Sequence, residues 1–138
     1  MQKHAEEISL QEFAHTNFKG ETRKYANIIS RFNKDAIVRV MLTAHWDTRA
    51  WADNDDDPAN HDKPILGAND GASAVAVLLE IARQLKRSPP PVGIDMVFFD
   101  CEDVGRHGDQ RTYAIGSQHF AKSLPKGWNA RFAVNLDM

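Results

Sequence analysis

The sequence predicts an α/β fold in which helices cover both faces of a largely parallel central sheet. Two observations lead to this fold class. Strand-like apolar runs at 36–44, 93–99 and 131–137 are separated by segments with helical periodicity. These runs are largely apolar instead of alternating, which is typical of strands that helices bury on both sides. We therefore expect one three-layer α/β/α domain over residues 1–138.

Length, charge and composition limit the function classes. The chain has 138 residues, of which 42% are hydrophobic and 26% charged, with a net charge of −2. No basic surface for nucleic acid or an anionic membrane is expected from this balance. The single cysteine, Cys101, excludes an internal disulfide. No apolar run reaches the roughly 20 residues of a membrane span, and the opening "MQKHAEEISL" lacks the apolar segment of a signal peptide. Location and oligomeric state stay open.

The N-terminal segment, residues 1–35, is weakly patterned. Within it, "SLQEFAHTNF" indicates a short helix and "YANIISRFN" a strand. The β-branched, apolar run "AIVRVMLTA" indicates the first clear strand, which stops where "HWDTRAW" begins. The following loop, 52–64, is rich in Asp, Asn and Pro, which are turn residues.

The second half of the chain alternates helix and strand. Apolar residues at three-to-four spacing predict an amphipathic helix over 71–86, and they are Val75, Leu78, Leu79, Ala82 and Leu85. "GIDMVFF" predicts a second strand, and a polar loop leads to a short helix around "SQHFAKSL". "RFAVNLD" predicts a third strand that runs to the last residue. A sheet of three strands is narrow for this architecture, so the sequence predicts a partial domain.

Polar residues follow each predicted strand or precede the predicted helix. They are His45, Asp47, Asp70, Glu102, Asp103 and Asp137. The carboxyl ends of parallel strands meet at one edge of a sheet, where binding groups collect. One imidazole and five carboxylates at one edge would repel strongly unless they are protonated or bridged by cations. Imidazole with carboxylate is a ligand set for zinc and its neighbours, so the sequence predicts a divalent metal site.

Several of these residues also have purely structural explanations. Asp70 could equally cap the predicted helix instead of binding metal, because Asp is a preferred N-terminal cap. His45 alone is typical of a polar loop, but Asp47 two residues later could orient a metal-binding imidazole. Asp100 is expected to bond backbone amides, and Cys101 to be a small buried residue and not a nucleophile.

Other candidate sites are weaker. The acidic run at 53–57 suggests a calcium loop, but Pro58 and Pro64 occupy the positions that require Gly and Glu. Three further histidines show no ligand spacing and are expected to face solvent: His61, His107 and His119. Three residues lie near the predicted site without a role that the sequence assigns: Trp46, Arg49 and Trp51.

Several motifs in order resemble one enzyme family. The string "AHWDTRAWADNDDDPANHDKPILGANDGASAVAVLLEIARQL", followed by "VFFDCEDVG", "GSQHF" and "NLDM", resembles the zinc-dependent exopeptidases that include di-zinc aminopeptidases and glutaminyl-peptide cyclotransferases. The resemblance covers about residues 27–138. It implies a phosphorylase/hydrolase-like α/β/α architecture with zinc at the carboxyl edge of the sheet.

The resemblance also implies a role for each residue at that edge. In the aminopeptidase arrangement, His45 and Asp137 resemble ligands of one zinc, Asp103 a ligand of the other, and Asp70 the carboxylate that bridges both. Asp47 resembles the residue that orients His45, and Glu102 resembles the general base. Most members have Glu-Glu where this chain has Glu102-Asp103. The family's last ligand, a downstream histidine, has no counterpart among these residues.

The resemblance leaves three possibilities, of which two are enzyme activities. An aminopeptidase that hydrolyses N-terminal residues from peptides is the first, because it is the wider class, and it would hold two zinc ions. The alternative is a glutaminyl-peptide cyclotransferase with one zinc held by Asp70 and Asp103, in which His45 binds no metal. The third is an inactive fragment that lacks the last metal ligand. For the two enzymes, the expected partners are peptides with a free N-terminus.

Overall fold

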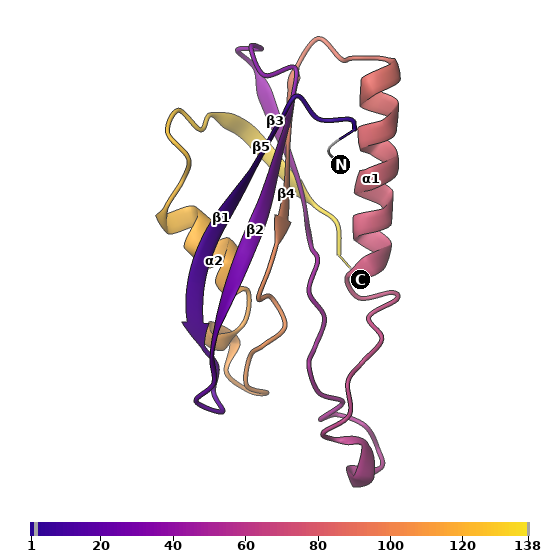
Figure 1. The fold of residues 1–138 in the computed structure, drawn as a ribbon, viewed down its shortest axis with the longest axis vertical. Coiled ribbons are helices and arrows are strands. Elements are labelled where there is room, and N and C mark those ends of the chain that lie inside the picture. The colour runs from indigo at the N-terminus through magenta and orange to yellow at the C-terminus, as the bar shows by residue number, and fades with distance from the viewer. Residues whose placement is uncertain (2, 138) are drawn as a thin grey trace.

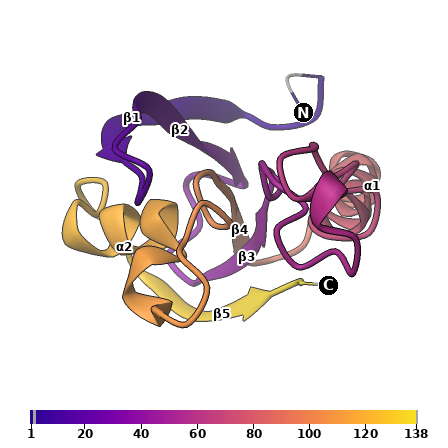
Figure 2. The ribbon, with the colours of Figure 1, turned by 90° about the horizontal axis from the view of Figure 1, so that it is seen from below.

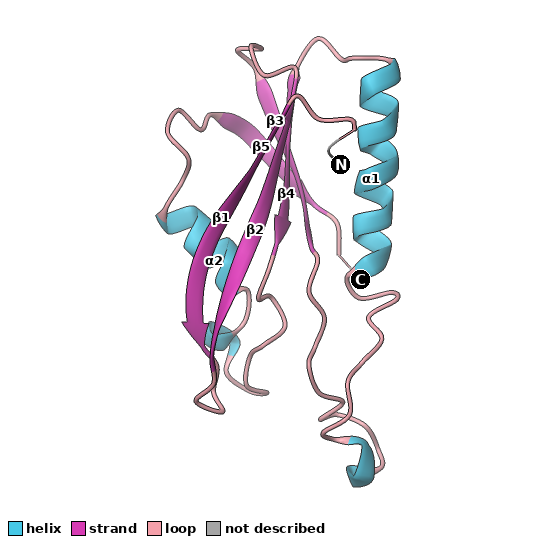
Figure 3. Ribbon diagram, viewed as in Figure 1, coloured by secondary structure: helices cyan, strands magenta, loops and turns pink. Residues whose placement is uncertain are grey.

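The computed structural model describes residue 1 and residues 3–137. Five strands form one sheet, and two α-helices pack against it (Figures 1 and 3). The strands are β1 (Glu7–Thr16), β2 (Thr22–Phe32), β3 (Arg39–His45), β4 (Gly93–Phe99) and β5 (Ala130–Asn135). The helices are α1 (Ala72–Arg87) and α2 (Ile115–Lys122), and 3-10 turns lie at Pro58–Asn60 and Gln110–Thr112. The predicted α/β class is therefore correct.

The sheet is mixed, with the strand order β1-β2-β4-β3-β5. β3 is parallel to both of its neighbours, β4 and β5, whereas β2 is antiparallel to β1 and β4. β4 is central, and six of its seven residues are buried. The parallel part of the sheet is the part that the apolar runs predict, and the antiparallel hairpin β1-β2 widens it at one edge.

Two local predictions are wrong. Residues 9–18, predicted as a short helix, lie mostly in β1, which pairs with β2 from Glu7 opposite Arg31 to Thr16 opposite Thr22. Leu10 and Phe13 imitate helical spacing, but ten residues of ladder pairing with β2 decide the outcome. The last strand also stops at Asn135 and does not run on through Asp137.

Helices cover the sheet on both sides, as Figure 2 shows from one end. The buried stripe of α1 consists of Ala74, Leu78 and Ala82, and it packs on one face with Met96 and Phe98 of β4. On the opposite face, Phe120 of α2 packs against Val97 and Ile29. The three-layer arrangement follows from this division of the core. Within the described residues, no helix is both long and apolar enough to cross a membrane.

A buried ion pair joins the strands at the end of the sheet where β3 begins. Arg39 is 1% exposed and Asp95 0%. The Arg39 guanidinium donates to both carboxylate oxygens of Asp95, at 2.9 and 2.6 Å, and also to the backbone carbonyls of Asn33 and Phe32. Arg31 donates to the same carboxylate at 3.0 Å. β2, β3 and β4 are thus tied together by charged groups whose hydrogen bonds are satisfied.

Removing the charge of Asp95 should destabilise this end of the sheet. Asp95→Asn leaves the Arg39 guanidinium buried without its counter-ion, so we expect the free energy of unfolding to fall by about 3–5 kcal/mol in urea denaturation. Asp35→Asn is the matched control, because Asp35 pairs with Lys34 on the surface with 85% of its side chain exposed. An Asp95→Asn protein as stable as the control would show that the buried pair contributes little.

Candidate metal centre

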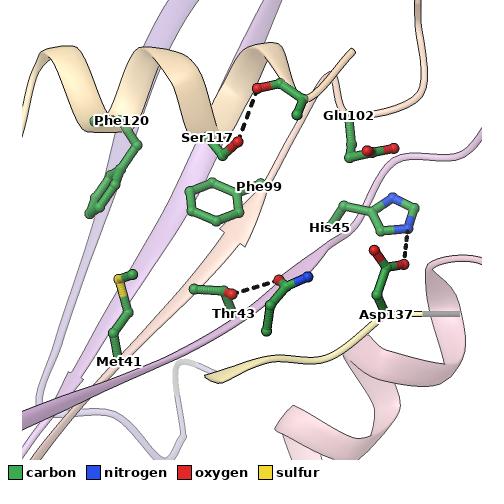
Figure 4. Close-up of a pocket in the computed structure, with 11 residues that line it drawn as sticks. Met41, Thr43, His45, Phe99, Glu102, Ser117, Phe120 and Asp137 are labelled. Carbon is green, nitrogen blue, oxygen red and sulfur yellow. Dashed lines mark hydrogen bonds and ion pairs between the residues drawn. The ribbon is translucent and has the colours of Figure 1, made fainter. Parts of the chain in front are cut away.

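His45 ends β3 and is the buried member of a cluster of three ionisable side chains. Only 4% of its surface is exposed. Its Nε2 atom lies 2.8 Å from Oδ1 of Asp70 and 3.5 Å from Oδ1 of Asp137. One potential ligand atom from each of the three residues can be chosen so that all lie within 4.8 Å of one another. Figure 4 shows the imidazole facing the Asp137 carboxylate, with Glu102 on the other side of the ring.

Strand register explains why these residues meet. Thr43 pairs with Asn135 in the parallel β3-β5 ladder, so His45 and Asp137 each lie two residues beyond a matched pair. His45 itself pairs with Phe99 at the end of β4, so the segment that carries Glu102 leaves the sheet at the same level. The predicted convergence at the carboxyl edge is therefore present for residues that follow all three parallel strands.

Asp70 lies in the loop before α1 and does not cap that helix. The N-terminal cap is Gly71, and no side chain caps the helix there. The Asp70 carboxylate, with its side chain 58% exposed, points to His45 instead. Gly71 makes this approach possible, because a Cβ atom there would lie 2.6 Å from Nε2 of His45. Of the two explanations that the sequence leaves open for Asp70, capping is thus wrong.

Asp47 connects the loop after β3 with the loop after β4. Its two carboxylate oxygens accept hydrogen bonds from the backbone amides of Glu102 and Asp103, each at 3.1 Å. Its Oδ1 atom also lies 3.5 Å from Nδ1 of His45, which is long for a hydrogen bond. Asp47 therefore supports the segment that carries two predicted functional carboxylates as well as facing the imidazole.

Glu102 and Asp103 are half-buried, and the pKa values of both carboxyl groups are raised. Burial raises the pKa of Glu102 to about 7, and the neighbouring Asp103 carboxylate adds to the shift. Burial also raises the pKa of Asp103, with repulsion from Asp70 as the next cause. Asp103 is thus affected by the charge of Asp70, but it does not belong to the cluster around Nε2 of His45. Of the four predicted metal ligands, His45, Asp70 and Asp137 form one cluster, and Asp103 lies outside it.

The same negative field acts on His45. Asp47 is the main reason why the pKa of His45 is raised to about 9 despite burial, and Glu102 and Asp70 contribute. A divalent cation would relieve the same repulsion between carboxylates that a proton on the imidazole relieves. One imidazole with several carboxylates is a donor set that zinc accepts. The residues at this edge therefore fit a zinc ion, although their roles as ligands stay predictions.

A pocket of about 360 Å³ opens beside this cluster. Glu102, His45 and Asp137 lie at one end of it, and Phe99 and Phe120 form apolar walls (Figure 4). Deeper polar groups come from the sheet, where the Thr43 hydroxyl donates to Oδ1 of Asn135 at 2.6 Å. The pocket thus combines apolar walls with a few polar groups, as small-molecule and peptide sites do.

The residues that were set aside largely behave as expected. Asp100 accepts hydrogen bonds from the amides of Ala26 and Cys101, which confirms its structural role. Cys101 is buried, and burial raises the pKa of its thiol to about 12. His107 is exposed as predicted, but the prediction is wrong for the other two histidines. His61 is half-buried, with its Nε2 atom 2.8 Å from the carbonyl oxygen of Asp55, and the half-buried ring of His119 stacks on Phe13 with 4.7 Å between ring centroids.

The structure also gives Arg49 a place that the sequence did not indicate. It is 8% exposed, and its guanidinium donates to the backbone carbonyls of Asp103 and Gly105. Hydrogen bonds from a side chain to distant backbone atoms leave no spacing pattern in a sequence. The only available signal was the nearness of Arg49 to His45 and Asp47 in "HWDTRAW".

Known proteins resemble this chain in both sequence and fold. Glutaminyl-peptide cyclotransferase of Bos taurus is 29% identical over 112 residues, which cover 74% of this chain and 29% of that protein. A glutaminyl cyclase of Tannerella forsythia is 44% identical with a TM-score of 0.90, covering 99% of this chain and 49% of that one. This chain thus spans about half of the solved structure and less than a third of the curated relative.

Structures described as peptidases match equally well. A leucine aminopeptidase precursor of Bacteroides thetaiotaomicron is 41% identical with a TM-score of 0.93, over 99% of this chain and 50% of that one. A Zn-dependent exopeptidase of Parabacteroides distasonis is 37% identical with a TM-score of 0.93, over 99% and 49%. These matches agree with the resemblance that the motifs carry.

Residues 27–138 match a protein-family model that is described as Peptidase family M28. The matched range begins within β2 and contains each of the residues that meet at the carboxyl edge of the sheet. With most of its length matched in this way, the chain belongs to Peptidase family M28.

Proposed function

We propose that this protein is a zinc-dependent enzyme that acts on the free N-terminus of peptides. The support is twofold. The relatives include glutaminyl cyclases, an aminopeptidase precursor and a Zn-dependent exopeptidase. The carboxylates at the carboxyl edge are ligands that zinc accepts, and a cation there would relieve their mutual repulsion. Both reactions of this family begin with a peptide whose first residue enters the site.

Of the two reactions, we propose cyclisation of N-terminal glutamine, although the aminopeptidase was the first expectation because it is the wider class. The observation that carries this choice is that glutaminyl cyclases are the most frequent names among the relatives, such as those of Bos taurus and Tannerella forsythia. In the cyclotransferase arrangement His45 would bind no metal. The 2.8 Å contact between Nε2 of His45 and Oδ1 of Asp70 would then let the imidazole orient that carboxylate.

In this arrangement Asp70 and Asp103 would hold one zinc ion, together with any further ligand that the protein supplies. Zinc bound there would polarise the carbonyl of the glutamine side-chain amide. His45 donates to Asp70 and fixes the direction of that carboxylate, as a residue behind a metal ligand commonly does. Asp137, 3.5 Å from the same nitrogen, supports the orientation of the imidazole.

Glu102 is the proposed acid and base. Its half-buried carboxyl group, with a pKa near 7, can accept a proton and return it at neutral pH. The α-amine nitrogen attacks the side-chain amide carbon, so the ring C–N bond forms and the bond to the amide nitrogen breaks. Glu102 takes a proton from the attacking amine and gives it to the departing nitrogen, which leaves as ammonia. The product is an N-terminal pyroglutamate.

Hydrolysis by an aminopeptidase mechanism is the second candidate. It is favoured by the leucine aminopeptidase precursor, which is 41% identical. It is also favoured by the grouping of His45, Asp70 and Asp137, which has the composition of a site for an additional zinc. In that case Glu102 would take its proton from water and pass it to the leaving amine of the shortened peptide.

Substrate turnover separates the two reactions. The protein, expressed with whatever sequence flanks these residues in its gene and loaded with zinc, should convert a glutaminyl peptide to pyroglutamyl peptide with one ammonia per turnover. It should not release nitroaniline from aminoacyl-nitroanilides. Mass spectrometry and a coupled ammonia assay measure the first reaction, and absorbance the second. Release of nitroaniline without cyclisation would contradict the proposal and favour the aminopeptidase.

Replacing the proposed acid and base should remove turnover and keep the metal. Glu102→Gln is expected to lower kcat by about 10²- to 10⁴-fold, because the amide cannot carry the proton, while zinc content stays unchanged. Glu80→Gln on the exposed face of α1 is the matched control and should behave like the parent. A Glu102→Gln protein with parental kcat would exclude Glu102 from this role.

Metal content should follow Asp70 and Asp103 more than His45. We expect one zinc per protein after dialysis, measured by elemental analysis, and activity that a chelator removes and zinc restores. His45→Gln should retain most of that zinc, whereas Asp70→Asn and Asp103→Asn should lose it. Asp62→Asn, in a loop with its side chain 96% exposed, is the control. Two zinc ions per protein, one of them lost in His45→Gln, would support the two-metal arrangement instead.

A further inference from the structure

Arg49 lies where the loop after β3 meets the loop after β4. Its side chain is almost fully buried, although the loops around it are mostly accessible. One terminal nitrogen donates to the carbonyl of Asp103 at 2.9 Å and to the carbonyl of Gly105 at 3.1 Å. A single guanidinium nitrogen thus holds two backbone groups, one on each side of Val104.

The two side chains Asp47 and Arg49 together hold Asp103 from both directions. The amide of Asp103 donates to Oδ2 of Asp47 at 3.1 Å, and its carbonyl accepts from Arg49. The peptide groups before and after Asp103 are therefore both fixed by side chains. Both of these side chains belong to the short segment that follows His45. The position of Asp103 is tied in this way to the strand that carries the imidazole.

Arg49 is itself held in one orientation. Its Nε and second terminal nitrogen donate to the two carboxylate oxygens of Asp53, at 2.7 and 2.5 Å. The guanidinium carbon lies 5.7 Å from the ring centre of Tyr113. That ring packs so closely on Gly105 that a Cβ there would be 2.2 Å from it. The hydrogen bond to Arg49 is also the main reason why the pKa of Asp53 is lowered.

We propose that Arg49 is a positioning residue that holds the backbone of Asp103 so that its carboxylate faces Asp70 across the metal-binding space. The proposal rests on the proposed function, in which these two carboxylates share one zinc. A lysine could supply the charge but not this geometry, because only the planar guanidinium can serve both carbonyls and the Asp53 carboxylate together. The role is one of alignment, and Arg49 itself contacts neither metal nor substrate.

The test is the zinc affinity of Arg49→Lys, measured by competition with a chromophoric chelator. Residues that orient metal ligands typically change affinity by about 10- to 100-fold when they are replaced, and we expect a loss in this range. Arg111→Lys is the matched control. Arg111 also pairs with a nearby Asp but is 90% exposed, and zinc affinity should not change there. An Arg49→Lys protein within twofold of the parent would overturn the proposal.

A second readout follows the backbone directly, without zinc. Hydrogen–deuterium exchange of the metal-free protein should be faster by about tenfold in residues 102–105 of Arg49→Lys, and unchanged in β3 and β4. Equal exchange of 102–105 in the variant and the parent would overturn the proposal. Faster exchange throughout the chain together with parental zinc affinity would also overturn it, since the role would then be one of general stability.

If Arg49→Lys does not fold, Asp53→Asn carries the same test. It keeps Arg49 but removes the carboxylate that orients it, so zinc affinity should fall by a smaller factor of about 3- to 10-fold. Unchanged affinity in Asp53→Asn would overturn the proposal. The zinc affinity of the parent protein separates failure of the proposed function from failure of the role proposed for Arg49. A parent that binds no zinc contradicts the proposed function, whereas a zinc-binding parent with unaffected Arg49 and Asp53 variants contradicts only the role of Arg49.

Discussion

The parallel pairing of β3 with β4 and β5 is the constraint on which the candidate site depends. Parallel strands deliver their carboxyl ends to one edge, and the pairs His45 with Phe99 and Thr43 with Asn135 set the level at which each chain segment leaves the sheet. Residues separated by as many as 92 positions, from His45 to Asp137, meet for that reason. At the opposite end of the sheet, the Arg39–Asp95 pair fixes β3 against β4 and so stabilises the register from which the site follows.

Concentrated negative charge is the consequence of that geometry, and it explains the electrostatics of the edge. The pKa values of Glu102 and Asp103 are raised first by burial and then by neighbouring carboxylates, and the pKa of His45 is raised mainly by Asp47. A bound cation would relieve the repulsion among the same groups. The charge of Asp47 adds to this repulsion, but its oxygens accept the amides of Glu102 and Asp103 and align the loop that carries both acids. The charge in "VFFDCEDVG" thus divides into distinct roles, with Asp100 bonding backbone amides, Glu102 lining the pocket and Asp103 repelled by Asp70.

Sequence reasoning predicted the parts of the structure that have a strong local signal. The three parallel strands, the long helix and the convergence of polar residues follow from hydrophobic periodicity and from the general geometry of parallel sheets. β1 was missed because an exposed edge strand with Leu10 and Phe13 three residues apart imitates a helix, and its pairing with β2 is a tertiary effect. Asp70 could equally have been a cap, and its contact with His45 is a tertiary contact that the close packing of Gly71 on the imidazole allows. The contacts of Arg49 with distant carbonyls have no local pattern at all.

The central claim is that Asp70 and Asp103 share one zinc while His45 remains hydrogen-bonded to Asp70. Anomalous diffraction at the zinc absorption edge, from crystals of the zinc-loaded protein, tests it most directly because the technique locates each metal independently of the protein atoms. The account predicts one anomalous peak between the carboxylates of Asp70 and Asp103, with Nε2 of His45 still within hydrogen-bond distance of Asp70. Two peaks about 3.5–4 Å apart, one of them bonded to His45 and Asp137, would contradict it.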